Sequence, residues 1–238
     1  MIRTLLFGAA GQMGRMVIAE LVESGDFSIV AGVEALGNKT IGGDIGGVAI
    51  IGDDRELPES DVWLDFSVAA AAVTHCQRAA EIGKPIVVAA TGFNQAQLSR
   101  IKAAAGKTTI LFVPNLSAGV GVMARLAGEA AALLKGDFEA VLEELHHSGK
   151  KDAPSGTALL IDGEMTAAGV TPVTYSLRAG GAVGEHTVRF VGSDEELVIT
   201  HRAWSRRAFA RGVPRALKFV VGKSPGFYTL RELFQTGL

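Results

Sequence analysis

The chain lacks the features that mark secreted, membrane-spanning and nucleic-acid-binding proteins. Its 238 residues include one cysteine, Cys76, which excludes a disulfide framework and favours a reducing compartment. The net charge of −2 argues against nucleic acid as the main partner. No apolar run approaches the ~18 residues of a membrane span, and no targeting segment is visible. We therefore expect a cytoplasmic protein with neither a nucleic-acid nor a membrane partner.

The composition is that of a folded protein with a sizeable core. Hydrophobic residues make up 48% of the chain and charged residues 20%, which makes disorder unexpected. The length suits one large or two modest domains. Cys76 lies in an alanine-rich helical stretch, so we interpret it as core packing rather than as a reactive thiol.

Short apolar stretches alternate with helical patterns as far as Pro114. Strands are predicted over residues 4–7, 27–33, 62–66, 85–89 and 109–113, and helices over 15–23, 69–82 and 95–105. This alternation requires crossover connections. It therefore predicts a parallel sheet covered on both faces, as in an α/β Rossmann dinucleotide-binding domain.

The pattern changes after Pro114. We predict helices over 120–134 and 154–168, and strands over 138–145, 173–178, 186–191 and 196–203. Consecutive strands with short connections indicate an α+β domain with an antiparallel or mixed sheet. Residues 206–233 look mostly helical and return to the first domain. The predicted domains are 1–117 with 206–238 for dinucleotide binding, and 118–205 for substrate binding and oligomerisation.

A glycine-containing turn joins the first predicted strand to the first helix. Glycines with this spacing let the backbone approach a pyrophosphate, and the helix N-terminus supplies N–H donors. Ala9 stands where the commonest fingerprint has its first glycine, so the pattern is a variant, and a tight turn without a ligand is the alternative. The predicted contacts are Gly8, Ala9, Ala10, Gly11, Gln12, Met13 and Gly14.

Glu34 stands at the end of the second predicted strand, twenty residues after Gly14. A carboxylate there can accept hydrogen bonds from the adenosine ribose, and it would repel a 2′-phosphate. Ala35 offers no cation to offset that repulsion. The pattern favours NADH over NADPH, and the alternative is an exposed loop carboxylate.

The densest chemistry lies between Glu144 and Thr157. His146 and His147 end a strand, and a loop carrying Lys150 and Lys151 follows. Ser155-Gly156-Thr157 then opens a helix, whose N–H groups and hydroxyls suit an anion. A histidine beside them can donate a proton near neutral pH. The segment can thus bind a carboxylate and protonate a neighbouring atom.

Simpler interpretations exist for each part of this segment. Adjacent histidines on a strand point to opposite faces, so one belongs to the core or to the surface. Ser155-Gly156-Thr157 could be an ordinary helix cap, and Lys151 a solvated charge. No His-Glu-x-x-His or cysteine pair is present, so no metal is expected. His75, His186 and His201 are scattered and are more typical of structural roles.

Several motifs together resemble the bacterial dihydrodipicolinate reductase family, also called 4-hydroxy-tetrahydrodipicolinate reductases. The resemblance rests on His146-His147 with Lys150 and on Asp152 to Thr157, and it extends over nearly the whole chain. Further similar motifs are Gly8–Gly14, Asp65-Phe66-Ser67, Ala90-Thr91-Gly92-Phe93, Pro114-Asn115-Leu116-Ser117, Arg178-Ala179-Gly180, Gly184-Glu185-His186-Thr187 and Thr200-His201.

The resemblance implies an NAD(P)H-dependent oxidoreductase of lysine and diaminopimelate biosynthesis, a homotetramer with a Rossmann domain and a mixed-sheet domain. It would reduce 4-hydroxy-tetrahydrodipicolinate to tetrahydrodipicolinate, with His146 as general acid and Lys150 assisting. The implied dicarboxylate ligands are His147, Ser155, Gly156, Thr157 and, at the return to the first domain, Arg206. Further implied cofactor contacts are Phe66, Ala89, Ala90, Thr91, Val113, Pro114, Asn115 and Leu116.

Two other functions fit parts of the pattern. One is another two-domain NAD(P)H enzyme, such as an amino-acid dehydrogenase. The other is a non-catalytic sensor that binds a dinucleotide and a dicarboxylate. The sequence also departs from the family, since Ser148-Gly149 replaces a more basic pair and thins the positive charge near the substrate.

Overall fold

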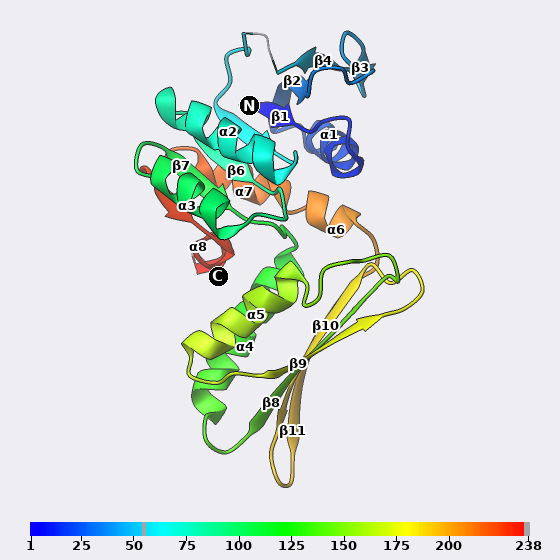
Figure 1. Cartoon of the computed structure of the whole chain (residues 1–238), viewed down its shortest axis with the longest axis vertical. Helices are drawn as coiled ribbons and strands as arrows, with labels where there is room; N and C mark the ends of the chain where they lie inside the picture. Colours follow the sequence, from blue (N-terminus) through cyan, green and yellow to red (C-terminus); the bar gives the residue numbers. More distant parts are fainter. Residues whose placement is uncertain (54–55, 236–238) are drawn as a thin grey trace. The chain divides into compact units, whose positions relative to one another are not determined.

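The computed structural model describes residues 1–53 and 56–235 and divides into two units (Figure 1). Met1–Leu116 and Phe209–Leu238 belong to the first unit, and Ser117–Ala208 form the second. These boundaries differ from the predicted domains by at most three residues. Within the described ranges, no helix is both long and apolar enough to cross a membrane.

An eight-stranded sheet forms the centre of the first unit, in the order β12-β7-β6-β5-β1-β2-β4-β3. Its neighbouring strands pair in parallel, except for the antiparallel pair of β3 and β4. The parallel sheet predicted from the alternating pattern is therefore confirmed. The strands are β1 (Ile2–Phe7), β2 (Phe27–Glu34), β3 (Asp44–Ile45), β4 (Val48–Gly52), β5 (Val62–Asp65), β6 (Ile86–Val88), β7 (Thr109–Phe112) and β12 (Gly226–Tyr228).

Helices cover both faces of this sheet. On β1, Leu5 and Phe7 join a core cluster with residues of α2 and α3, whereas Leu6, one position out of phase, is buried outside that cluster. Helix α7 packs against β5, β6 and β7 and also contacts α1. The helices are α1 (Gln12–Ser24), α2 (Ala69–Glu81), α3 (Gln95–Ala104), α6 (Arg207–Ala210), α7 (Val213–Val220) and α8 (Leu230–Gln235).

The C-terminal segment corrects one prediction. Residues 206–233 were expected to be mostly helical, but Gly226–Tyr228 form β12, which extends the sheet edge in parallel with β7. Three residues are too few to show a periodicity, so this strand is defined by its pairing rather than by its own pattern. The two-residue strand β3 escaped prediction for the same reason, and the five-residue strand β4 was also not predicted.

Cys76 packs in the core, as predicted. Its side chain is buried in the cluster between α2 and the sheet. Burial, together with the charge of Asp65, raises the pKa of the thiol to about 12. The thiol is therefore protonated at neutral pH and unsuited to nucleophilic chemistry.

The second unit is a four-stranded sheet with two helices on one face (Figure 1). The strand order is β11-β10-β8-β9; β8 and β9 are parallel and the other pairs are antiparallel, so the predicted mixed sheet is confirmed. The elements are α4 (Ala118–Leu134), β8 (Glu139–His146), α5 (Gly156–Ala167), β9 (Val173–Arg178), β10 (Gly184–Val191) and β11 (Glu196–Ala203).

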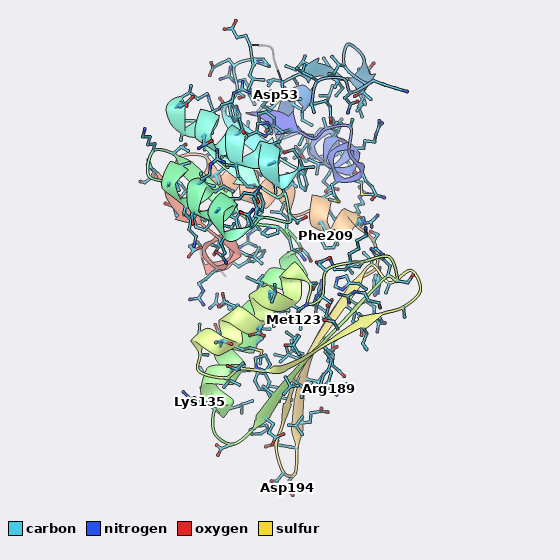
Figure 2. The ribbon with its side chains drawn as sticks, in the orientation of Figure 1. Asp53, Met123, Lys135, Arg189, Asp194 and Phe209 are labelled. Atoms are coloured by element: carbon cyan, nitrogen blue, oxygen red, sulfur yellow. The ribbon has the colours of Figure 1, made fainter. Side chains whose placement is uncertain are left out.

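Along strand β8, the buried row of alternate side chains begins with apolar residues and ends with polar ones. Alternate positions Ala140 and Leu142 pack in a cluster with α4 and α5. Glu144 and His146 continue that same buried row. Arg189 of β10 lies on the opposite face, where it pairs with Glu143 (Figure 2). The alternation thus places a carboxylate and an imidazole at the end of the core.

Candidate active site

Four loops leave the sheet of the first unit at the carboxyl ends of neighbouring strands. Hydrogen bonds join the start of each later loop to the end of the neighbouring strand. Phe66 N–H donates to Phe7 O (3.0 Å), Ala89 N–H to Asp65 O (2.8 Å) and Val113 N–H to Val88 O (2.9 Å). The strand order reverses direction at β1, where open α/β sheets bind their ligands. The structure therefore brings together the loops that contain the predicted cofactor contacts.

Two glycines of the loop after β1 leave no room for a side chain. Gly8 has φ +75°, and a Cβ there would lie 2.8 Å from the backbone of Phe66. A Cβ on Gly14 would lie 2.6 Å from Ala9 O and closer still to Gly8 O. Helix α1 begins directly after Gly11, which supplies no side-chain cap. The loop and helix start fit a pyrophosphate, because the backbone N–H groups at the start of α1 have no side-chain cap at Gly11.

Glu34 is tied to the glycine loop and is half-buried rather than a free surface carboxylate. One oxygen accepts a hydrogen bond from Ala10 N–H (2.6 Å), and the other accepts from Asn38 Nδ2 (2.8 Å). A carboxylate held beside a phosphate-binding loop is well placed to accept from a ribose diol. Its ribose contact stays a prediction.

The predicted cofactor contacts range from exposed to buried. Thr91 and Pro114 are exposed. Other members have buried side chains and can present little beyond backbone atoms, namely Ala9, Ala89, Ala90, Val113 and Leu116.

A buried ion-pair network, which sequence reasoning missed, supports the Phe66 loop. The Asp65 carboxylate is fully buried and contacts His75 Nδ1 at 2.6 Å. Its other oxygen accepts from Ser67 N–H at 2.7 Å. The His75 ring stacks on Phe7, with centroids 3.9 Å apart. His75 therefore has a structural role, holding the loop that lies against Gly8.

In the second unit, Glu144 and His146 form a buried pair at the end of β8. Glu144 Oε2 contacts His146 Nδ1 in an ion pair. Glu144 Oε1 accepts from Arg178 (2.8 Å) and from the backbone N–H of Ser155 (3.1 Å). The Glu144 side chain has no exposed surface, and that of His146 is 10% exposed. The proton donor expected from the sequence is thus embedded in a charged, ordered environment.

Burial and the charge of the partner act in opposite directions on the pKa of each residue of this pair. Burial alone would raise the pKa of Glu144, but hydrogen bonds from Arg178 and Ser176 and the charge of His146 bring it to about 2. Burial lowers the pKa of His146, and the charge of Glu144 acts in the opposite direction. Glu144 is therefore ionised at neutral pH and favours a protonated His146.

Ser155 caps α5 with its side chain. Its buried hydroxyl accepts from Ala158 N–H at 3.1 Å and lies 3.2 Å from His186 Nε2. Burial, with the charge of His146, lowers the pKa of His186 to about 4. The predicted cap is present, while substrate binding by Ser155, Gly156 and Thr157 stays a prediction; Gly156 is exposed and Thr157 is buried.

One ion pair and one hydrogen bond hold the loop after β8. Lys150 Nζ lies 2.9 Å from Asp152 Oδ2, and Arg178 donates to Asp152 O at 2.5 Å. Arg178 therefore joins this loop to Glu144. Lys150 keeps 22% of its side chain exposed, which leaves it accessible to a bound anion.

His147 faces a different environment from its neighbour. It lines a hollow of about 280 Å³ together with Gly181, Val183 and Arg206. The structure thereby brings together two predicted substrate ligands, His147 and Arg206, that are far apart in the sequence. A hollow of this size with an imidazole and a guanidinium suits a small anionic molecule.

Sequence reasoning assigned no role to Glu144 and only a structural one to His186. The alternation along β8 contained the signal for Glu144, because it shares the core-facing parity of Leu142. The approach of His186 to His146, with ring centroids 5.2 Å apart, depends on strand register and had no local signal.

One atom each of Glu144, His146 and His186 lies within 4.8 Å of the others, a spacing that a metal ion could bridge. Both oxygens of Glu144 are already engaged, however: Oε2 contacts the His146 ring, and Oε1 contacts the Arg178 guanidinium and the Ser155 N–H. The arrangement favours hydrogen bonding over ion coordination.

Comparison with known proteins places both units in one family. Residues 2–116 match the family described as "Dihydrodipicolinate reductase, N-terminus", and residues 119–234 match "Dihydrodipicolinate reductase, C-terminus". The chain is 36% identical to a 4-hydroxy-tetrahydrodipicolinate reductase of Anaeromyxobacter dehalogenans, covering 98% of this chain and 97% of that one. It is 35% identical to the enzyme of that name from Magnetococcus marinus, covering 95% and 96%.

Solved structures show the same fold. A dipicolinate-bound dihydrodipicolinate reductase from Paenisporosarcina sp. TG-14 superposes with a TM-score of 0.78 at 21% identity, over 96% of this chain and 97% of that one. An aspartate dehydrogenase from Thermotoga maritima gives 0.54 at 14% identity, over 94% and 98%. The fold is thus shared with other dehydrogenases, whereas the sequence matches distinguish among them. The chain belongs to the dihydrodipicolinate reductase family.

Proposed function

We propose that the protein reduces 4-hydroxy-tetrahydrodipicolinate to tetrahydrodipicolinate in lysine and diaminopimelate biosynthesis. The observation that carries the proposal is the arrangement at the end of β8. There a buried proton donor, His146, adjoins a cation-bearing loop, and the next residue lines a hollow with Arg206. A substrate with two carboxylates needs both anion recognition and a proton, and this unit supplies groups for each.

The roles follow from the chemistry of each group. His146 supplies a proton from Nε2, because Nδ1 faces Glu144. Lys150 stabilises negative charge on the substrate. His147 and Arg206 bind one carboxylate, while the first-turn N–H groups of α5 at Gly156 and Thr157 bind an anionic group. The reaction consumes one proton and one hydride and releases the 4-hydroxyl group as water.

A nicotinamide dinucleotide fits the first unit, and when bound in its reduced form it supplies the hydride. The glycine loop and the start of α1 would hold the pyrophosphate, and Glu34 the ribose. Because a carboxylate repels a 2′-phosphate, we infer a preference for NADH over NADPH. Ala35 beside it offers no compensating charge.

The direct experiment is an assay with NADH and freshly generated substrate, following the loss of cofactor absorbance. The variants His146→Gln and Lys150→Ala should lose turnover while retaining NADH affinity, since both residues lie in the second unit. Wild-type turnover in both variants would contradict the proposal. Binding of both ligands without turnover in the wild type would indicate a sensor, and turnover on an amino acid instead would indicate an amino-acid dehydrogenase.

We also infer that the protein forms a homotetramer through the uncovered face of the second sheet. Val173, Tyr175 and Leu177, alternate residues of β9, are each more than half exposed on that face. Light scattering at micromolar concentration tests this, and Tyr175→Glu should shift the mass towards smaller species. A cytoplasmic location and the lack of nucleic-acid or membrane partners stay predictions.

A further inference from the structure

The Glu144 carboxylate connects the proton donor to the start of the anion-binding helix. Its Oε2 contacts His146 Nδ1, and its Oε1 accepts from Ser155 N–H. Ser155 is the residue that caps α5. One carboxylate therefore fixes the ring of His146 and the first turn of α5 relative to each other.

The contact also determines which nitrogen of the His146 ring can transfer the proton. A carboxylate only accepts hydrogen bonds, so Nδ1 must carry a proton when it faces Glu144. This leaves Nε2 as the nitrogen that gains and loses the catalytic proton. Gly184, which starts β10, keeps the space beside Nε2 open, since its missing Cβ would lie 3.1 Å from that atom.

Glu144 is an unusual residue to find here unless it has such a role. An isolated carboxylate is costly to bury, and this one has no exposed side-chain surface. Arg178, which is 18% exposed, stabilises its charge from one side, and His146 lies on the other. A neutral side chain of similar size would remove the buried charge and would leave Arg178 without its anionic partner.

We propose that Glu144 is a positioning residue for the reaction: it fixes the tautomer and orientation of His146 and favours the protonated ring. The inference rests on the proposed function, because it takes His146 as the proton donor. The charge of Glu144 opposes the lowering of the His146 pKa by burial, which agrees with this role. Loss of that charge should move the high-pH limb of the rate profile to lower pH.

The test compares Glu144→Gln, His146→Gln and the double variant in the full-length protein. Glu144→Gln should lower kcat about 100-fold, near the lower end of a general acid's contribution. NADH affinity should be unchanged. The double variant should be no slower than His146→Gln alone, because a residue that acts through His146 has no further effect once the ring is gone. The matched control is Glu139→Gln, an exposed carboxylate at the other end of β8.

A second readout reports the ring itself rather than the rate. The chain has five histidines, so ¹⁵N spectra of histidine-labelled protein can be assigned with the His146→Gln variant. The wild type should show His146 protonated at Nδ1 when neutral. Glu144→Gln should shift that signal towards the other tautomer or lower its titration midpoint.

The outcomes separate this inference from the proposed function. Wild-type turnover in His146→Gln would overturn the proposed function, and this inference with it. Loss of turnover in His146→Gln but not in Glu144→Gln would overturn the positioning role alone. A double variant markedly slower than His146→Gln would also overturn it, since Glu144 would then act independently.

Glu144→Asp keeps the test valid if the glutamine variant does not fold. Aspartate retains the charge that Arg178 needs but is one methylene too short to contact both His146 and Ser155 N–H. We expect reduced kcat, with a His146 spectrum different from that of the wild type. Wild-type values for both in a folded Glu144→Asp protein would overturn the proposal.

Discussion

Gly184 and His146 face each other across neighbouring strands so closely that a Cβ on Gly184 would lie 3.1 Å from His146 Nε2. The contact is tight, and either the ring or strand β10 would have to move by a few tenths of an ångström. Only glycine leaves the proposed donating nitrogen unobstructed.

Gly184→Ala should lower kcat about tenfold, because small displacements of a proton donor reduce rates steeply. NADH affinity, measured by fluorescence titration, should not change. Gly163→Ala in α5 is the control, since a Cβ there meets nothing within 4 Å. Equal kcat in the two alanine variants would show that the space beside Nε2 is not needed.

Gly14→Ala should abolish tight dinucleotide binding. The added Cβ would collide with the backbone oxygens of Gly8 and Ala9, which cannot move as a flexible side chain can. Overpacking of this kind costs about 1–3 kcal/mol in stability. Isothermal titration with NADH and urea denaturation measure the two effects. Unchanged NADH affinity would argue against a role for this loop in cofactor binding.

Glu34→Gln should raise the ratio of NADPH to NADH efficiency about tenfold, because removing one negative charge relieves repulsion of a 2′-phosphate. The measurement is kcat/KM for both cofactors at low ionic strength. Asp44→Asn is the control, an exposed carboxylate on the short strand β3. A ratio that moves equally in both variants would point to a general charge effect.

His186→Gln should make stability less sensitive to acid between pH 6.5 and 4. The folded pKa of His186, about 4, lies below its ordinary value of 6.5, so in this window the unfolded chain binds a proton that the folded one does not. Its contribution, about 3 kcal/mol, is present above pH 6.5 and is lost as pH falls towards 4. Urea denaturation at pH 7.5 and pH 4 should show a smaller difference in the variant. Equal differences would contradict a buried neutral His186.

His75→Ala should destabilise the first unit by about 3 kcal/mol, because the Asp65 carboxylate then stays buried without its histidine partner. Removing the half-exposed partner of a surface pair, in Arg3→Ala, should cost much less. Thermal unfolding followed by circular dichroism compares the two. Similar losses of stability in the two variants would show that the buried pair contributes no more than the surface pair.

The sequence alone was enough to predict the fold class and the position of the candidate sites. Alternation of strands and helices predicted the parallel sheet, and the turn from Gly8 to Gly14 predicted where a dinucleotide binds. These features are local, because apolar periodicity and glycine spacing are visible within about ten to fifteen residues. The motif from His146 to Thr157 likewise located the candidate chemistry and supported the family resemblance.

Only the tertiary structure shows which residues lie beside that motif in space. Strand register brings His186 beside His146 and places Arg178 on Glu144, residues separated by more than thirty positions in sequence. The strand Gly226–Tyr228 exists only because β7 offers an unpaired edge. Such pairings depend on which strands become adjacent, and a local pattern does not carry that information. The sequence therefore predicted the proton donor, while the fold brought it into contact with the carboxylate that we propose orients it.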